Sequence, residues 1–183
     1  MIRKATQEDI RVINGLQEFI ESLELDILSY CSEEKLREVL KFVFLSEEDR
    51  FSYKNCMVYE NEGAIQGFSF SYHYDEVIKM KDFWFNVVVN YFKLKKDLII
   101  FDYDEALEGE FYLDTLYVFS DVRGKGIGSK LLTEFVNNDQ NVLSLNVAQS
   151  NNRARKLYEG YGFYKSREIF IGHEHYDHLI NEK

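Results

Sequence analysis

Residues 123–128 have the sequence RGKGIG (Arg123 to Gly128), and they lie between an apolar run, Phe111 to Phe119, and a segment of helical periodicity, Ser129 to Val136. This order predicts a strand, a glycine-rich turn and a helix. Glycines at alternate positions let a ligand approach the backbone closely, and the N–H groups that open the helix carry partial positive charge. Because Arg123 and Lys125 add two formal charges at the same place, the stretch predicts a loop that binds a pyrophosphate.

Spacing excludes two other nucleotide-binding loops. A P-loop requires a Gly-Lys-Ser/Thr step at a set distance from its first glycine, and here Gly124 leads to Ser129-Lys130 instead. A dinucleotide-binding fingerprint requires glycine at position 129, or glycine or alanine at position 131, where this chain has Ser129 and Leu131. The pattern that fits is Arg-x-x-Gly-x-Gly.

A second segment follows the glycine loop at a short distance. Residues 141–149 (NVLSLNVAQ) alternate as a strand, and residues 151–163 (NNRARKLYEGYGF) predict a short helix that ends at a glycine before an extended run. With these two segments in this order, the chain resembles the GNAT family of N-acetyltransferases. Residues 1–5 and the helix start at Thr6 are a weaker third element, and the resemblance covers most of the chain outside roughly residues 75–109.

The resemblance implies acetyl-coenzyme A as the co-substrate and implies no metal. In the family the glycine loop holds the pyrophosphate, the strand before it lies along the pantetheine, and an Asn opens the later helix. A backbone N–H at Val118 or a neighbour would polarise the thioester carbonyl. The matching residues are Leu116, Tyr117, Val118, Arg123, Gly124, Lys125, Gly126, Ile127, Gly128, Ser129, Asn151 and Tyr158. Asn146, one strand earlier, is expected to bond backbone groups.

Acetyl transfer to an amine requires a proton acceptor for the amine and a proton for the departing thiolate. Tyr158 matches the family's tyrosine near the coenzyme A sulfur, so we expect its phenol to protonate the thiolate. Asp114, on the strand ahead of the loop, is the first candidate for the base, and Glu110 and His73 are alternatives. In a regular strand Asp114 faces away from its two neighbours, but a β-bulge near Tyr117 would change which face reaches the pocket.

The expected fold is α/β, with one domain over residues 1–183. It has a GNAT-like mixed, largely antiparallel sheet of six or seven strands flanked by helices. Ile2 to Ala5 predicts an edge strand, Thr6 with Asp9 predicts a helix start, and Ser32 predicts the cap of a second helix. Residues 55–59 and 64–74 predict a hairpin, and residues 163–170 and 175–180 predict the closing strands. Helical spacing over residues 77–94 predicts an inserted helix between the third and fourth strands, serving as padding or as a lid.

The amino-acid composition limits the kinds of molecule that this protein is expected to bind. With 22 Lys and Arg against 32 Asp and Glu, the formal net charge of −10 argues against a general nucleic-acid binder and favours a cationic amine acceptor. The amino terminus lacks the apolar core of an export signal, and no apolar run approaches the length of a membrane span, so we expect a cytoplasmic protein without a membrane partner. Cys31 and Cys56 lack metal or redox spacing and are expected to be reduced.

The predicted function is N-acetyl transfer from acetyl-coenzyme A to a primary amine of a small molecule or a protein, by direct attack in a ternary complex. Two alternatives are a non-catalytic acyl-coenzyme A sensor and an acidic interaction protein whose loop is only a turn.

His173, His175 and His178 look like metal ligands, but in a strand the third points away from the other two, so a polar hairpin is expected instead. An exposed final strand would allow a homodimer.

Overall fold

The computed structural model describes residues 1–23 and 25–183 of the chain. In chain order its main elements are β1 (Ile2–Lys4), α1 (Arg11–Ser22), α2 (Ile27–Tyr30), α3 (Glu33–Leu45), β2 (Cys56–Asn61), β3 (Ala64–His73), α4 (Val77–Phe83), α5 (Val89–Tyr91), β4 (Phe111–Val118), α6 (Ile127–Val136), β5 (Val142–Ala148), α7 (Asn152–Gly160), β6 (Tyr164–Ile171) and β7 (Glu174–Glu182).

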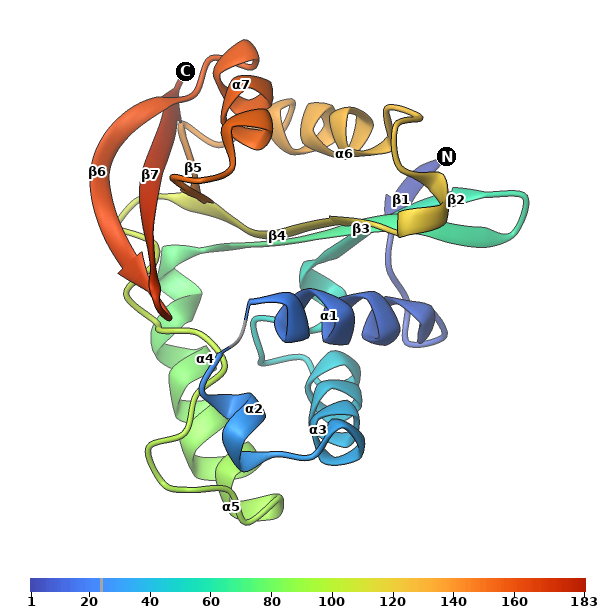
Figure 1. The fold of residues 1–183 in the computed structure, drawn as a ribbon, viewed down its shortest axis with the longest axis vertical. Coiled ribbons are helices and arrows are strands. Elements are labelled where there is room, and N and C mark those ends of the chain that lie inside the picture. The colour runs from blue at the N-terminus through green and yellow to red at the C-terminus, as the bar shows by residue number, and fades with distance from the viewer. Residues whose placement is uncertain (24) are drawn as a thin grey trace.

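The strands form one seven-stranded sheet in the order β1-β2-β3-β4-β5-β7-β6. Its neighbouring pairs are antiparallel, except that β4 and β5 run parallel. Helices α6 and α7 cover one face, and α1 to α5 lie on the other (Figure 1). The predicted α/β fold with a mixed, mostly antiparallel sheet is therefore confirmed.

Strands β4 and β5 separate in the middle of the sheet. They pair only where Phe111 to Leu113 face Leu143 to Leu145. Beyond that point β4 stays paired with β3 as far as Val118, and β5 stays paired with β7 as far as Ala148. The two strands therefore diverge, and the sheet opens beside the carboxyl end of β4.

The first helix begins later than the sequence predicts. The Thr6 backbone N–H donates to Asp9 Oδ2 at 2.7 Å, as a capping-box start requires, but α1 begins only at Arg11. Asp9 is also paired with the Arg3 guanidinium at 2.8 Å, so these residues form a separate turn before the helix. The helical spacing of Ile10, Ile13, Leu16 and Ile20 predicts a buried stripe, but Ile10 lies before the helix and is 56% exposed. The other predicted cap is confirmed, because Ser32 Oγ accepts from the Lys35 N–H at the start of α3.

The inserted helix is confirmed between β3 and β4. It consists of α4, a π-helical segment at Trp84–Val88, and α5. Its buried residues join the larger core cluster, and Trp84 Nε1 donates to the Leu98 carbonyl oxygen at 2.7 Å. Phe42 of α3 stacks on Tyr91 of α5 with 5.0 Å between ring centroids. The insertion thus packs against α3 and supports the segment that leads back to β4.

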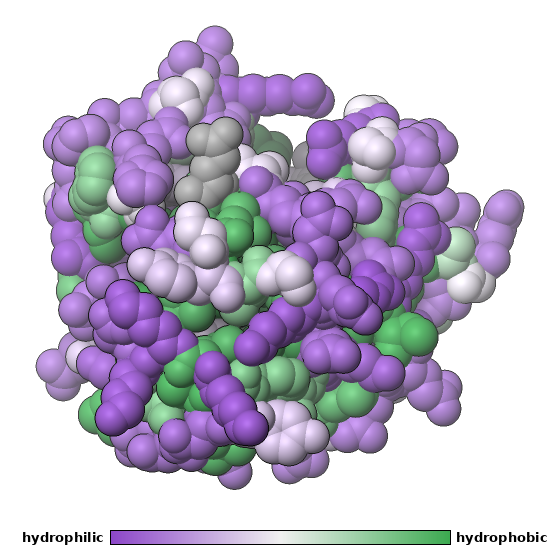
Figure 2. Space-filling model, turned by 60° about the horizontal axis from the view of Figure 1, so that its bottom comes forward, coloured by the Kyte–Doolittle hydropathy of each residue, from purple (hydrophilic) through white to green (hydrophobic). Residues whose placement is uncertain are grey.

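The core lies on both faces of the sheet. The larger cluster joins the sheet to α1, α3 and the insertion, and the smaller joins β4, β5 and β7 to α6, through residues such as Leu132, Phe135 and Leu145. Figure 2, turned toward the helices α1 to α5, shows apolar patches between hydrophilic side chains. Over residues 1–23 and 25–183, no helix has both the length and the apolar character needed to span a membrane.

Candidate active site

The glycine loop presents free backbone N–H groups to solvent. Gly124 and Gly126 have φ values of 82° and 76°, a left-handed conformation that disfavours other residues. A Cβ added at either position would meet no atom within 4 Å, so the space beside them is open. Among the residues that the structure describes, none accepts a hydrogen bond from the backbone N–H groups of Gly124 to Ser129. Together with the start of α6, these groups form a cradle suited to an anion.

Arg123 partly turns away from this cradle. Its Nε donates to the Val118 carbonyl oxygen at 2.9 Å, and its guanidinium carbon lies 5.7 Å from the centroid of the Tyr117 ring. The side chain therefore ties the loop to the end of β4 and also keeps a positive charge beside it. Lys125 is exposed on the loop.

A groove of 490 Å³ leads from the loop across β4 toward α7. Its lining residues are Phe19, Ser22, Leu116, Tyr117, Val118, Arg123, Ser129, Asn151, Arg153, Ala154, Leu157 and Tyr158. The structure thus brings the predicted residues of β4 and α7 together with Arg123 and Ser129, whereas Gly124 to Gly128 of the loop do not line the groove. Sequence reasoning missed Phe19 and Ser22 of α1, as well as Arg153 and Leu157, which lie four residues apart and therefore on one side of α7.

A second pocket of 170 Å³ continues the groove into the opening between β4 and β5. It shares Phe19, Leu116 and Tyr158 with the groove and is also lined by Asp114 and Asn146. The two predicted catalytic residues therefore border one pocket, at the place where the sheet opens.

Asn151 caps α7, as expected. Its Oδ1 accepts from the Ala154 N–H at 3.1 Å, and its side chain also borders the groove. Asn146 bonds one backbone group, the Glu105 carbonyl oxygen, at 3.3 Å, but it bonds side chains as well. It also lines the pocket in the opening between β4 and β5.

Tyr158 is half-buried on α7 and borders both spaces. Burial raises the pKa of its phenol to about 12. The phenol is therefore neutral at physiological pH. A thiol has a pKa of about 8.5, so the phenol is the weaker acid of the two. This result makes full protonation of the thiolate by Tyr158, which the sequence predicts, less favourable.

Asp114 lies in a β-bulge. Phe70 pairs with Thr115 and Ser71 pairs with Leu113, so Asp114 is the extra residue between them. The bulge is thus at Asp114 itself and not near Tyr117. The Asp114 side chain is 2% exposed and turns toward β3, where the Tyr72 hydroxyl donates to its Oδ2 at 3.1 Å.

Arg50, which follows α3, lies at the centre of a buried charged group. Its Nη2 is 2.5 Å from Asp114 Oδ2 and 2.8 Å from Glu105 Oε2, and its Nη1 donates to the Asp102 carbonyl oxygen at 2.9 Å. We call Asp49, Arg50, Glu105 and Asp114 the Arg50 cluster. Burial raises the pKa of Asp49 to about 6 and that of Glu105 to about 7, although Arg50 lowers both. No sequence motif marks this cluster.

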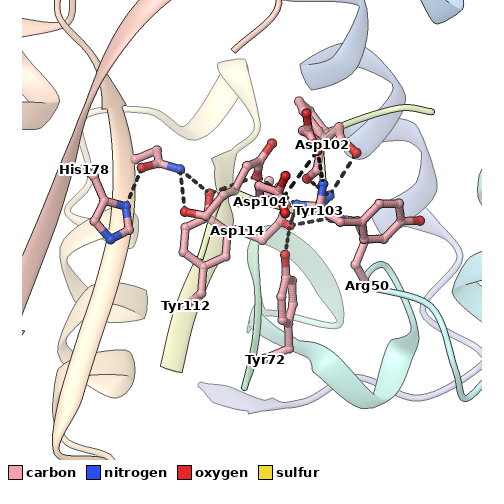
Figure 3. Close-up of polar contacts among 12 residues, drawn as sticks. Arg50, Tyr72, Asp102, Tyr103, Asp104, Tyr112, Asp114 and His178 are labelled. Carbon is pink, nitrogen blue, oxygen red and sulfur yellow. Dashed lines mark hydrogen bonds and ion pairs between the residues drawn. The ribbon is translucent and has the colours of Figure 1, made fainter. Parts of the chain in front are cut away.

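A chain of hydrogen bonds extends from the cluster across the opening to β7 (Figure 3). The Tyr112 hydroxyl donates to Glu105 Oε2 at 3.1 Å, and Asn146 Nδ2 donates to the Tyr112 hydroxyl at 3.0 Å. His178 Nδ1 lies 2.7 Å from Asn146 Oδ1, and its Nε2 lies 3.0 Å from Glu110 Oε1. The chain joins side chains of β4, β5 and β7 at the point where the sheet opens.

The two alternative bases lie in other surroundings. Burial would raise the pKa of Glu110, but hydrogen bonds, first of all from His178, lower it below its ordinary value. Glu110 is therefore a structural carboxylate held between His178 and Ser144, whose hydroxyl donates to it at 2.8 Å. His73 packs on Phe111 and borders a separate pocket that does not include Tyr158.

The three histidines near the carboxyl end have different neighbours. His173 Nε2 is 3.6 Å from Asp26 Oδ1, the His175 ring packs on Phe170, and His178 is buried against Glu110. Within residues 1–23 and 25–183, no group of three or more His, Cys, Asp or Glu side chains is placed to hold a metal ion.

Comparison with protein families decides the identity. The family model described as an acetyltransferase (GNAT) domain matches residues 52–165, more than half of the chain. The chain belongs to the GNAT acetyltransferase family. This membership makes it an acetyltransferase whose co-substrate is acetyl-coenzyme A and whose acceptor is an amine.

Solved structures support the membership. A protein described as an acetyltransferase is 32% identical, with a TM-score of 0.85 over 100% of this chain and 98% of its own. An N-acetyltransferase from Staphylococcus aureus Mu50 is 26% identical, with a TM-score of 0.84 over 98% of this chain and 99% of its own. A ribosomal-protein-alanine N-acetyltransferase from Brucella melitensis is 17% identical, with a TM-score of 0.60 over 100% and 99%, and shares the fold. The chain matches no curated protein.

Proposed function

We propose that this GNAT enzyme transfers the acetyl group of acetyl-coenzyme A to a primary amine of a small molecule or a protein, by direct attack in a ternary complex. The observation that carries the proposal is the continuous path from the free N–H groups of Gly124 to Ser129, along β4, into the pocket bordered by Tyr158 and Asp114. A path of this kind would hold both reactants at one point, where proximity itself accelerates the reaction.

The chain's own groups fit the co-substrate. The amides of Gly124 to Ser129 would bind the pyrophosphate, with positive charge from Lys125 and from Arg153 on the facing wall of the groove. Leu116 to Val118 would lie along the pantetheine, because β4 is no longer paired with β5 there and the edge of β4 is open. A backbone N–H at Val118 or a neighbour would point at the thioester carbonyl and stabilise the charge that develops on its oxygen.

Tyr158 would donate a hydrogen bond to the sulfur as the carbon–sulfur bond breaks. Because its pKa is about 12, complete proton transfer to a free thiolate is unfavourable, whereas a hydrogen bond to the developing charge is not. Asp114, which lines the same pocket, would accept the proton of the amine.

The test is thiol release from acetyl-coenzyme A against a panel of amines, with Tyr158→Phe and Asp114→Asn beside the wild-type chain. Tyr164→Phe, at an exposed position on β6, is the matched control. Transfer by the wild type, with losses in the first two variants on the order of 10²-fold, supports the proposal and the two roles. Unchanged rates in both would remove the roles and leave the activity. Heat of coenzyme A binding without thiol release on any amine would instead favour an acyl-coenzyme A sensor.

A further inference from the structure

Two buried carboxylates share one guanidinium nitrogen beside the pocket. Glu105 Oε2 and Asp114 Oδ2 both pair with Arg50 Nη2, and all three side chains are at most 4% exposed. A third buried carboxylate, Asp49, also acts on Arg50 and Asp114 through its charge. One cation thus faces three buried carboxylates, so the cluster holds more negative charge than Arg50 can neutralise.

The hydrogen bonds are distributed unequally between the shared carboxylates. Asp114 accepts from Arg50 Nε at 2.7 Å, from Tyr72 at 3.1 Å and from the Thr115 hydroxyl at 2.9 Å. Asp114 is thus surrounded by three side-chain donors. Glu105 Oε1, in contrast, is buried without a partner among the described residues.

We propose that Glu105 is a positioning residue for deprotonation of the acceptor amine: by sharing Arg50 with Asp114, it supplies the second negative charge that lets the Glu105–Asp114 pair take up the proton of the amine. This inference rests on the proposed function. Asp114 borders the pocket with Tyr158, whereas Glu105 does not, so Glu105 acts through the shared guanidinium. Glu105 comes from the segment between the inserted helix and β4.

The proton balance is complete. The acceptor enters as an ammonium, gives one proton to the carboxylate pair at Asp114, and keeps the electron pair that forms the bond to the acetyl carbon. The carbon–sulfur bond breaks with its electrons on sulfur, and the second N–H proton passes to that sulfur. The products are the amide, the free thiol and a protonated carboxylate pair, which returns its proton to solvent.

The pair should titrate near neutral pH. Burial raises the pKa of Glu105 to about 7, Arg50 opposes this shift, and the charge of Asp114 adds to it. The other ionisable groups near the pair are Asp49, Tyr72, Tyr103, Tyr112 and Tyr176. Because the two carboxylates interact strongly, the observed value belongs to the pair. We therefore expect kcat/KM to fall on the acidic side of about pH 7.

The decisive variant is Glu105→Gln, with Glu108→Gln in the same segment, where the side chain is exposed, as the matched control. In Glu105→Gln, the carboxylate pair has lost one of its two negative charges, so the acidic limb of kcat/KM should move to lower pH, and the plateau should fall on the order of 10²-fold. Glu108→Gln should match the wild type. If the plateau of kcat/KM falls but its acidic limb stays at the same pH, the role of Glu105 is merely structural and the proposal is overturned. A pH profile of kcat/KM identical to that of the wild type would overturn it as well.

A second comparison separates this inference from the proposed function. Ethylamine is protonated at neutral pH, whereas trifluoroethylamine, of similar size, is largely not. The loss of kcat/KM in Glu105→Gln should therefore be large with ethylamine as the acceptor and small with trifluoroethylamine. Equal losses with both amines would overturn the role of Glu105. If the wild-type chain binds coenzyme A but transfers acetyl to neither these amines nor any panel amine, the proposed function fails, and the role of Glu105 fails with it.

Discussion

The glycine loop lies at one end of the groove and the Arg50 cluster lies beside the pocket that continues it, but the two regions are built in opposite ways. The loop is one stretch, Gly124 to Ser129, whose free backbone N–H groups lie at the surface. The cluster collects side chains from distant segments, with Arg50 lying 55 residues from Glu105 and 64 from Asp114, and it is almost completely buried. Binding by backbone groups is a local property, whereas a shared buried charge exists only after the chain has folded.

The two regions should also respond differently to substitution. Changes in the loop should alter coenzyme A binding and have a smaller effect on stability than changes in the cluster, because Gly124 and Gly126 lie in open space. Changes in the cluster should alter stability and the response to pH, because a buried charge without its partner is costly.

The largest effect is expected from Arg50→Met. This variant leaves Asp114 and Glu105 buried without their shared cation, so the free energy of unfolding should fall by about 3–5 kcal/mol. Urea unfolding at neutral pH measures it. Arg37→Met, on the exposed side of α3, is the control and should stay close to the wild type. Similar losses in both variants would contradict the distinction between the two regions.

The second largest effect is expected in the pH dependence of the free energy of unfolding, to which Glu105 contributes. Its pKa is about 7 in the folded state and about 4.3 in the unfolded chain, so the folded protein binds its proton more tightly. This contribution to stability is complete below the unfolded value and is lost as the pH rises through about 7.

Urea unfolding of the wild type and Glu105→Gln across this window tests the sign. The difference between their unfolding free energies should change by at most about 1.4 kcal/mol per pH unit, with the wild type losing stability relative to the variant as the pH rises. A difference that is constant with pH, or that changes in the opposite direction, would show that Glu105 does not hold a proton in the folded protein.

Within the loop, Gly126→Ala should weaken coenzyme A binding by at least about tenfold, because the added Cβ would stand in the open space where the pyrophosphate is expected. It should also cost about 1–2 kcal/mol of stability through the left-handed backbone. Gly63→Ala is the matched control, with a φ of 75° and the same open surroundings in the β2–β3 turn. Calorimetry with coenzyme A should give equal affinities for Gly63→Ala and the wild type. Weaker binding in both variants would remove the argument for this loop.

The smallest effect is expected from Asn151→Ala, which removes the cap of α7 and should cost about 1 kcal/mol. Ser32→Ala removes the matching cap of α3 and should cost a similar amount. Only the first variant should change coenzyme A binding, because Asn151 alone borders the groove. Thermal unfolding and calorimetry on both variants separate capping from binding, and equal affinities would reduce Asn151 to a cap.

Local patterns predicted the elements that form the cofactor side of the site. The end of α6 at Val136 and the Asn151 cap agree with the sequence because a glycine turn and a helix start depend on nearby residues. The start of α1 was wrong because Asp9, which bonds Thr6 as predicted, is also paired with Arg3 of β1. The surroundings of Asp114 were not predictable either, since a one-residue shift against β3 decides where the side chain points.

The sequence by itself determined the family, the place of the pyrophosphate loop and the order of strands and helices, because these follow from short patterns of glycine, charge and apolar spacing. Only the tertiary structure decided which carboxylates share Arg50, which oxygen of Glu105 is left without a partner, and how β4 and β5 open beside Tyr158. The physical reason is range: backbone conformation is set by neighbouring residues, whereas desolvation and charge pairing depend on every segment that packs around the group.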